Sequence, residues 1–281
     1  MPGKQVNELD ALPSFTDNSL LPVHNGAGLK KGLLSQLASY LGTKFSNPNL
    51  LINPDFKINQ RGATSYEQQG YSVDRWKIWN VTVTPNTNGG ITVKNDKYAD
   101  TGTFLQYLEN ATEGDSTLSC YVTSVSGTVT MVADDNSQVV LKQGLNVVHT
   151  SASTKTFTIF LNRGTSITLK WVKLEQGKVA TEYIVPNPAE EITKCYRFKY
   201  IGKAVLRGRC TANQIFGFTK DLPTKLRTKP TITFKSKNTY NVNTVDTTLA
   251  GENNAVYLAG TAENTNQTVI DVVLDLDAEI Y

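Results

Sequence analysis

Side chains that could do acid–base chemistry are few in this sequence, and the clearest set lies near its end. In segment 268–281, Val, Leu and Ile alternate with acidic residues, so Asp275, Asp277 and Glu279 share one face of an expected strand. Neighbouring carboxyl groups on such a face lie ~7 Å apart, a separation that inverting glycosidases use. Nothing around them predicts a buried acid with a raised pKa. We therefore interpret them as a solvated face, and we expect no catalytic residue and no enzyme.

Aromatic side chains form the second candidate set, because ring faces pack well on the C–H surfaces of sugars. Tyr71, Trp76 and Trp79 lie close together in the sequence, and Trp171 ends an alternating segment. Trp79 follows Trp76 by three residues, so on a strand the two rings face opposite sides. We expect Trp76 and Trp171 in the core, which leaves Trp79 as the exposed ring.

Two further sets have both a structural and a binding interpretation. Asp74 and Arg75 are adjacent, and we interpret them as an ion pair that fixes a loop, with a binding-site pair as the alternative. Asn59–Gly62 predicts a turn whose Arg61 stacks or hydrogen-bonds locally, with ligand contact as the alternative.

His24 and His149 are expected at the surface or in turns. The three cysteines lack CxxC spacing, so we expect free thiols in a reducing compartment: Cys120, Cys195 and Cys210.

Charge and hydropathy exclude several classes of protein. The 281 residues include 28 Lys and Arg against 25 Asp and Glu, a net charge of +3 without any dense basic run, so we expect no nucleic-acid partner. No apolar stretch approaches the ~18–20 residues of a membrane helix, so we expect no membrane insertion. Residues 1–15 lack the apolar region of a secretory signal.

The composition favours β structure, since the chain has 35 Thr, which suit strands, and 24 Asn, which suit turns. Three parts are expected: residues 1–49, 50–186 and 187–281. In the first, we expect a short strand at Leu20–Val23 and one amphipathic helix at Ser35–Leu41, ended by Gly42. That helix is too short to be stable alone, so it must dock on a partner surface.

Short apolar runs, separated by turn signals at intervals of roughly ten residues, fill the second part and predict an antiparallel sandwich or jelly roll. They are Ile91–Val93, Phe104–Leu108, Leu118–Val122, Thr128–Val132, Val139–Leu141, Thr156–Phe160 and Ile167–Val172. After a proline-containing link at Val185–Pro188, an amphipathic segment at 189–196 precedes a small C-terminal β module. Its expected strands are Arg197–Ile201, Ala204–Arg209, Gln214–Phe218, Thr231–Lys235, Val256–Ala259 and Thr268–Tyr281.

Several spaced motifs resemble bacteriophage tail-fibre and related virion-appendage proteins with a carbohydrate-binding jelly roll. Asn49–Gly62 followed by Tyr71–Trp76 is similar to the opening pattern NLLINGDF…NQRG…Y…DRW of that domain. Trp171–Pro186 is similar to its closing W-x-x-LE-G-x-VAT pattern, and Glu191–Phe198 to the E-x-x-x-C-x-R-(F/Y) that follows. Leu222–Thr233 resembles the distal module of such fibres, and residues 7–41 resemble an anchoring peptide.

The resemblance implies a virion appendage, assembled in the host cytoplasm, that is homotrimeric and attaches to other virion proteins through its N-terminal segment. The anchor residues that it implies are Leu20, Leu21, Val23, Leu37 and Leu41. Related jelly rolls often hold a structural Ca²⁺, but Lys57 and Lys170 stand where carboxylates are usual. Hard cations need oxygen ligands, so we expect no metal and no cofactor.

The leading functional hypothesis is a fibre or spike subunit that recognises a host-surface glycan, with Trp79, Tyr71 and Arg61 as candidate glycan contacts. One alternative is a purely architectural head fibre or decoration protein. A polysaccharide depolymerase is disfavoured, because such phage spikes usually carry a long β-helix and this chain shows no internal repeat.

Overall fold

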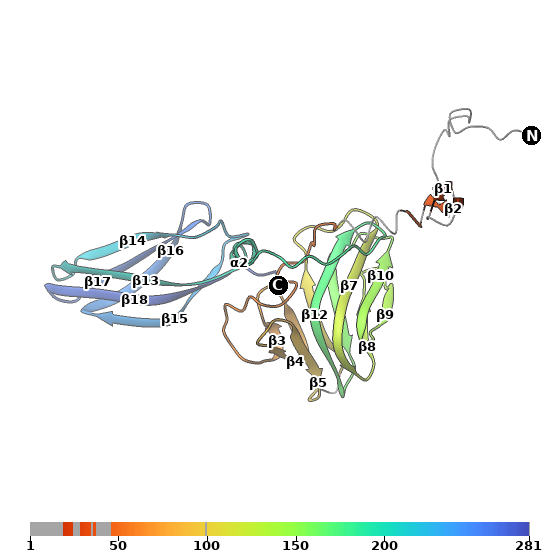
Figure 1. Cartoon of the computed structure of the whole chain (residues 1–281). Helices are drawn as coiled ribbons and strands as arrows, with labels where there is room; N and C mark the ends of the chain where they lie inside the picture. The colour runs from red at the N-terminus through yellow and green to blue at the C-terminus, as the bar shows by residue number, and fades with distance from the viewer. Residues whose placement is uncertain (1–18, 25–28, 35, 38–45, 99, 281) are drawn as a thin grey trace, which may run out of the picture. The chain divides into compact units, whose positions relative to one another are not determined.

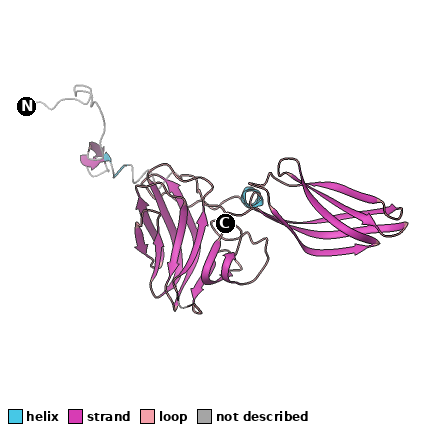
Figure 2. Ribbon diagram, turned by 180° about the vertical axis from the view of Figure 1, so that it is seen from behind, coloured by secondary structure: helices cyan, strands magenta, loops and turns pink. Residues whose placement is uncertain are grey.

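A computed structural model describes residues 19–24, 29–34, 36–37, 46–98 and 100–280 of the chain. Strands far outweigh helices in these residues (Figure 2), and their pairings are all antiparallel. The prediction of a mostly β protein is therefore confirmed. Two compact units are present: residues 1–48 with 179–184, and residues 49–178 with 185–281.

The first unit contains a β-hairpin. Strands β1 (Leu20–His24) and β2 (Leu29–Leu33) pair with Leu20 opposite Leu33. This confirms the strand expected at Leu20–Val23. Most of the helix expected at Ser35–Leu41 lies outside the described residues. The two described residues of that range, Gln36 and Leu37, are helical.

The second unit begins with a jelly roll of eight strands, whose order along the chain and in space agree with that topology. The strands are β5 (Ile91–Asn95), β6 (Gly102–Tyr107), β7 (Ser116–Ser126), β8 (Val129–Val132), β9 (Gln138–Val140), β10 (Gly144–Thr150), β11 (Thr156–Leu161) and β12 (Thr165–Gln176). They form the orders β5-β12-β7-β10 and β6-β11-β8-β9, so that the first strand pairs with the last, the second with the seventh, the third with the sixth and the fourth with the fifth. Strands β12 and β7 of the first sheet lie side by side in Figure 1. This rolled pairing is the jelly-roll arrangement, and it confirms the prediction.

Two further strands extend the jelly roll. Strand β4 (Lys77–Pro85) pairs with β5 through Thr82–Pro85 and with β6 through Lys77–Trp79, so it connects the two sheets. Strand β3 (Tyr66–Tyr71) pairs with β4 alone. The segment before β4 therefore closes one end of the sandwich.

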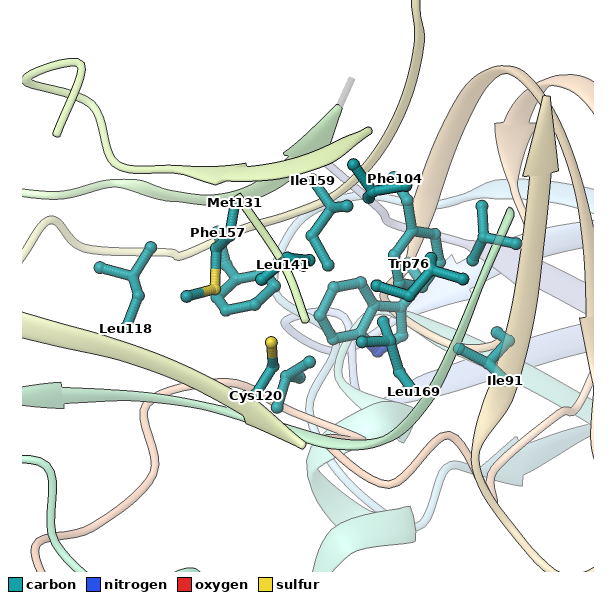
Figure 3. Close-up of a cluster of buried hydrophobic side chains, with 14 of the residues drawn as sticks. Trp76, Ile91, Phe104, Leu118, Cys120, Met131, Leu141, Phe157, Ile159 and Leu169 are labelled. Atoms are coloured by element: carbon teal, nitrogen blue, oxygen red, sulfur yellow. The ribbon is translucent and has the colours of Figure 1, made fainter. Parts of the chain in front are cut away.

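Alternating side chains from both sheets fill the jelly-roll core around Trp76 (Figure 3). The Trp76 ring is fully buried, stacks on Phe104 at 4.7 Å between centroids, and meets Phe157 edge-on at 5.9 Å. Its predicted core position is confirmed. Cys120 lies in the same core, where burial raises the pKa of its thiol to about 12 and keeps it protonated.

The C-terminal part of this unit begins with helix α2 (Pro188–Tyr196), which covers the segment described from the sequence as amphipathic. The side chain of Asn187 accepts a hydrogen bond from the Ala189 N–H, and Pro188 occupies the first turn, where no N–H is needed. Two three-stranded sheets follow and share one core. They are β13 (Lys199–Cys210), β18 (Asn266–Asp277) and β15 (Thr231–Tyr240), and β14 (Ile215–Asp221), β17 (Ala255–Ala262) and β16 (Val242–Ala250).

The structure corrects several predicted strands. Strands β2, β3, β4, β10 and β16 were not predicted, and β18 ends at Asp277 rather than continuing to residue 281. The two strands predicted within Arg197–Arg209 are one strand, β13. Gly202 looks like a break in the sequence, but the ring of Tyr200 covers it, so the glycine packs inside a continuous strand.

Candidate functional site

The residues of the N-terminal motif converge on Asn53, which organises the end of the jelly roll. Asn53 is fully buried in the left-handed region at φ 56°. Its Nδ2 donates to the carbonyls of Ile58 and Asp74, and its Oδ1 accepts from the Ile58 N–H. The Trp76 indole donates to the Asn53 carbonyl at 2.9 Å. These bonds hold two loops together, which gives the motif a structural role.

Arg75 joins the jelly roll to the C-terminal part through a buried ion pair. Its guanidinium lies 2.5 Å from the Glu279 carboxylate, donates to the Tyr107 carbonyl, and lies 3.6 Å from the centre of the Phe198 ring. Arg75 and Glu279 are 1% and 3% exposed. The predicted Asp74–Arg75 ion pair is therefore wrong, because Arg75 pairs with a residue 204 positions later.

Asp74 instead binds the Asn59–Gly62 turn. Its carboxylate accepts from the Gln60 backbone N–H and from the Gln60 amide, each at 2.7 Å. The same Gln60 side chain donates to the Lys199 carbonyl and accepts from the Ile201 N–H, so it is clamped between both parts of the unit. We call Arg61, Asp74, Arg75, Lys199, Asp277 and Glu279 together the seam.

Two of the three predicted glycan contacts lie at this seam. The Arg61 guanidinium is 3.6 Å from both Asp277 and Glu279, and it lies 5.5 Å from the centre of the Tyr71 ring. The Tyr71 hydroxyl donates to the Ile280 carbonyl. Both side chains therefore contact the C-terminal residues, whereas their contact with a glycan stays a prediction.

The carboxylates of the last strand are not the solvated face that the sequence predicted. Lys199, 5% exposed, lies 2.5 Å from Asp275 and 3.0 Å from Asp277, while Glu279 is buried against Arg75. Partial burial opposes ionisation of Asp277, but the hydrogen bond and charge of Lys199 outweigh it and lower the pKa. Such a carboxyl stays ionised, so it is poorly suited to act as a general acid.

Burial makes Asp74 the pH-sensitive member of the seam. Loss of hydration raises the pKa of its carboxyl from 3.8 to about 6, against the hydrogen bonds of Gln60 and the charge of Arg61. Folded chains therefore hold this proton to a higher pH than unfolded chains do. The stabilisation that results is complete below pH 3.8 and is lost as the pH rises through about 6.

We expect the free energy of unfolding to carry a contribution from Asp74 that declines by about 3 kcal/mol between pH 4 and pH 7. Urea unfolding across this range measures it, with Asp74→Asn as the variant that cannot titrate. The difference between wild type and variant should change with pH in that window and stay constant above it. Parallel pH profiles for the two proteins would contradict the assignment.

Trp79 and Trp171 are the two tryptophans that lie outside the core. Trp79 is 52% exposed on β4, opposite Thr103 of β6, which confirms that it is the exposed ring. Trp171 was predicted to be buried, but it is absent from the core and its ring lies 6.1 Å from that of Tyr121. Tyr121 was not predicted as a surface ring, although its place between the core residues Cys120 and Val122 indicates an outward side chain.

A cavity of about 490 Å³ lies beside the seam, lined by the loop after β6 and by Leu50, Gln176 and Phe198. Glu109 in this loop forms a two-pronged ion pair with Arg197, at 2.7 and 2.9 Å. Arg75, the cation in the wall, is paired with Glu279. Both of these charged groups in its wall are therefore already paired within the chain.

No group of three or more His, Cys, Asp or Glu suited to a metal ion occurs within the described ranges. Lys57 lies 2.7 Å from Asp55, so an ammonium group neutralises this carboxylate. The three cysteines are buried free thiols, as predicted, and burial raises the pKa of Cys195 most strongly. No helix among the described residues is long and apolar enough to span a membrane.

Of the predicted anchor residues, Leu20 and Leu37 are exposed and Leu21 and Val23 lie on β1. Leu41 is outside the described residues.

Comparison of the sequence with protein-family models and with curated proteins finds no match.

Proposed function

We propose that this chain is a subunit of a bacteriophage virion appendage whose jelly roll recognises a host-surface glycan. The observation that carries the proposal is an exposed tryptophan on a rigid jelly-roll sheet: Trp79, 52% exposed on β4. Exposed indole rings give sugars an apolar face to stack on. The resemblance of the motifs in Asn49–Trp76 and Trp171–Pro186 to phage fibre domains supports the same proposal.

The N-terminal unit is proposed to attach the chain to other virion proteins, and the chain to act as a homotrimer. Four apolar side chains in its described part are exposed: Leu20 at 59%, Leu37 at 42%, Val179 at 38% and Ile184 at 66%. A shallow sugar site binds weakly alone, and several copies on one particle multiply its effective affinity. Light scattering of the full chain tests the trimer, and a stable monomer would contradict it.

Replacing Trp79 with Ala should weaken binding of the full chain to host cells or their surface polysaccharide by about tenfold or more. The matched control is Val140→Ala, which removes a 51% exposed apolar side chain from β9 without removing a ring. Flow cytometry with labelled protein measures both variants. Equal binding by Trp79→Ala and wild type would remove Trp79 from the site.

An architectural role, as head fibre or decoration protein, is the second candidate. The buried seam supports it, because Arg75–Glu279 joins two β modules into one compact unit that can bridge components. Antibody labelling of intact particles distinguishes capsid from tail attachment. Absence of binding to any host polysaccharide would favour this role, and new reducing ends after incubation with host capsule would instead show a depolymerase.

A further inference from the structure

The outer face of the sheet β10-β7-β12-β5 carries a pair of aromatic rings. Tyr121 of β7 lies opposite Trp171 of β12 on one side and Leu145 of β10 on the other. The Tyr121 and Trp171 ring centres are 6.1 Å apart with 34° between their planes. Tyr121 is 39% exposed and Leu145 59% exposed. The two rings are tilted neighbours on one face, and such a pair can contact successive rings of a sugar chain.

A β-bulge at Lys170 produces this arrangement. Leu169 pairs with Val122 and Trp171 with Tyr121, so Lys170 is the extra residue on β12. Leu169 and Val172 both point into the core, and the two residues between them are displaced to the outside. The ammonium of Lys170 lies 5.8 Å from the centre of the Tyr121 ring. Bulges often re-aim side chains in this way beside functional sites.

Hydroxyl groups and a second lysine continue the same face along the strands. A row here means residues that lie opposite one another on β7, β12 and β5. The row next to Tyr121 and Trp171 contains Ser124, Thr168 and Thr92, and the following row contains Ser126, Ser166 and Lys94. The hydroxyls of Thr92 and Thr168 lie 3.1 Å apart. We call the rows from Leu145–Tyr121–Trp171 to Ser126–Ser166–Lys94, together with Lys170, the sheet strip.

The charge of the sheet strip selects its ligand. Lys94 and Lys170 are exposed, and neither forms an ion pair with any described residue. The three rows contain no Asp or Glu. A sugar chain with acidic groups fits all three features of this surface. Its rings can stack on the aromatic side chains, its hydroxyls can exchange hydrogen bonds with Ser and Thr, and its carboxylates can pair with the lysines. Nucleic acid would need more phosphate-binding cations than two lysines supply.

We propose that the sheet strip binds an acidic polysaccharide, with Tyr121 and Trp171 stacking on sugar rings and Lys94 and Lys170 pairing with sugar carboxylates. This inference rests on the proposed glycan recognition and assigns it a second surface and a ligand class. It places binding on β7 and β12, on the sheet opposite to that of Trp79.

Affinity electrophoresis and calorimetry of the full chain test the proposal with polygalacturonate, alginate and hyaluronate as acidic probes, and dextran and pullulan as neutral ones. We expect at least one acidic polymer to bind and to weaken with added salt. Tyr121→Ala and Lys170→Gln should each weaken this binding by about threefold to tenfold or more, and Val140→Ala on β9 should leave it unchanged. Lys170→Gln alters only an exposed side chain, so its effect does not depend on folding.

The outcomes separate this inference from the proposed function. Loss of host-polysaccharide binding in Trp79→Ala but not in Tyr121→Ala would overturn the sheet strip and leave glycan recognition intact. Binding of none of the three acidic polymers, or equal binding of neutral ones, would also overturn it. Tighter binding of single-stranded oligothymidylate, lost in Tyr121→Ala, would assign the strip to nucleic acid instead. Failure to bind host polysaccharide at all would remove both proposals.

Discussion

Replacing Glu279 with Gln should lower the free energy of unfolding by about 3 kcal/mol or more. The variant removes one charge of a buried pair and leaves the Arg75 guanidinium, 1% exposed, without a counter-charge. A hydrogen bond to the Tyr107 carbonyl and a cation–π contact with the Phe198 ring hold Arg75 in place, so it cannot move into water at little cost. Urea unfolding followed by far-UV circular dichroism measures the change.

Glu252→Gln is the matched control, because its side chain is 89% exposed and its ion pair with Lys225 is at the surface. The control should leave stability nearly unchanged, because water screens this surface ion pair. The double variant Arg75→Met with Glu279→Gln removes both buried charges, and it should be less destabilised than the two single changes add up to. Equal stabilities of Glu279→Gln and Glu252→Gln would show that the seam contributes nothing.

Truncating Trp76 to Ala should cost roughly 3–5 kcal/mol, because it empties a fully buried site in a core that cannot collapse to fill it. The indole stacks on Phe104, contacts Phe56 at 5.1 Å between ring centres, and donates to the Asn53 carbonyl. The variant therefore loses packing and also leaves a buried acceptor with one partner fewer. Chemical denaturation of the purified chain measures the loss.

Trp79→Ala makes the same chemical change three residues away, at a side chain that is 52% exposed, and serves as the control. It should alter stability by less than about 1 kcal/mol, since most of that ring already contacts water. If both variants lost similar stability, the assignment of Trp76 to the core and of Trp79 to the surface would be wrong. The pair thus tests the fold and the proposed binding ring together.

The seam gives the proposed function a mechanical basis. Glu279 from the C-terminal tail contacts Arg75 of the jelly roll, while Gln60 bonds to Lys199 and Ile201 of β13. These contacts are buried or partly buried, so solvent screens them less than surface pairs. A module that binds a surface can therefore transmit force to its neighbour without a flexible joint at this point.

The sequence alone determined most of the strands and the turns between them, because both depend on local chemistry. Alternation of Leu118, Cys120 and Val122 identifies β7 and its inward face, since side chains on a strand repeat every two residues. Asn136 and Gly127 have positive φ, which these residue types tolerate, so the predicted turns fall where the chain reverses. The seven runs predicted in the jelly roll are all strands.

Tertiary structure alone decided which partner each charged or aromatic side chain meets. Asp74 and Arg75 are adjacent in sequence, but Arg75 adopts φ 73°, and only the folded chain brings Glu279 to its guanidinium. Trp171 points outward because its register with β7 contains a bulge, and pairing between strands some 50 residues apart sets that register. Local periodicity specifies an element and its faces, whereas ion pairs, bulges and the surfaces they create depend on contacts between distant segments, which no local pattern encodes.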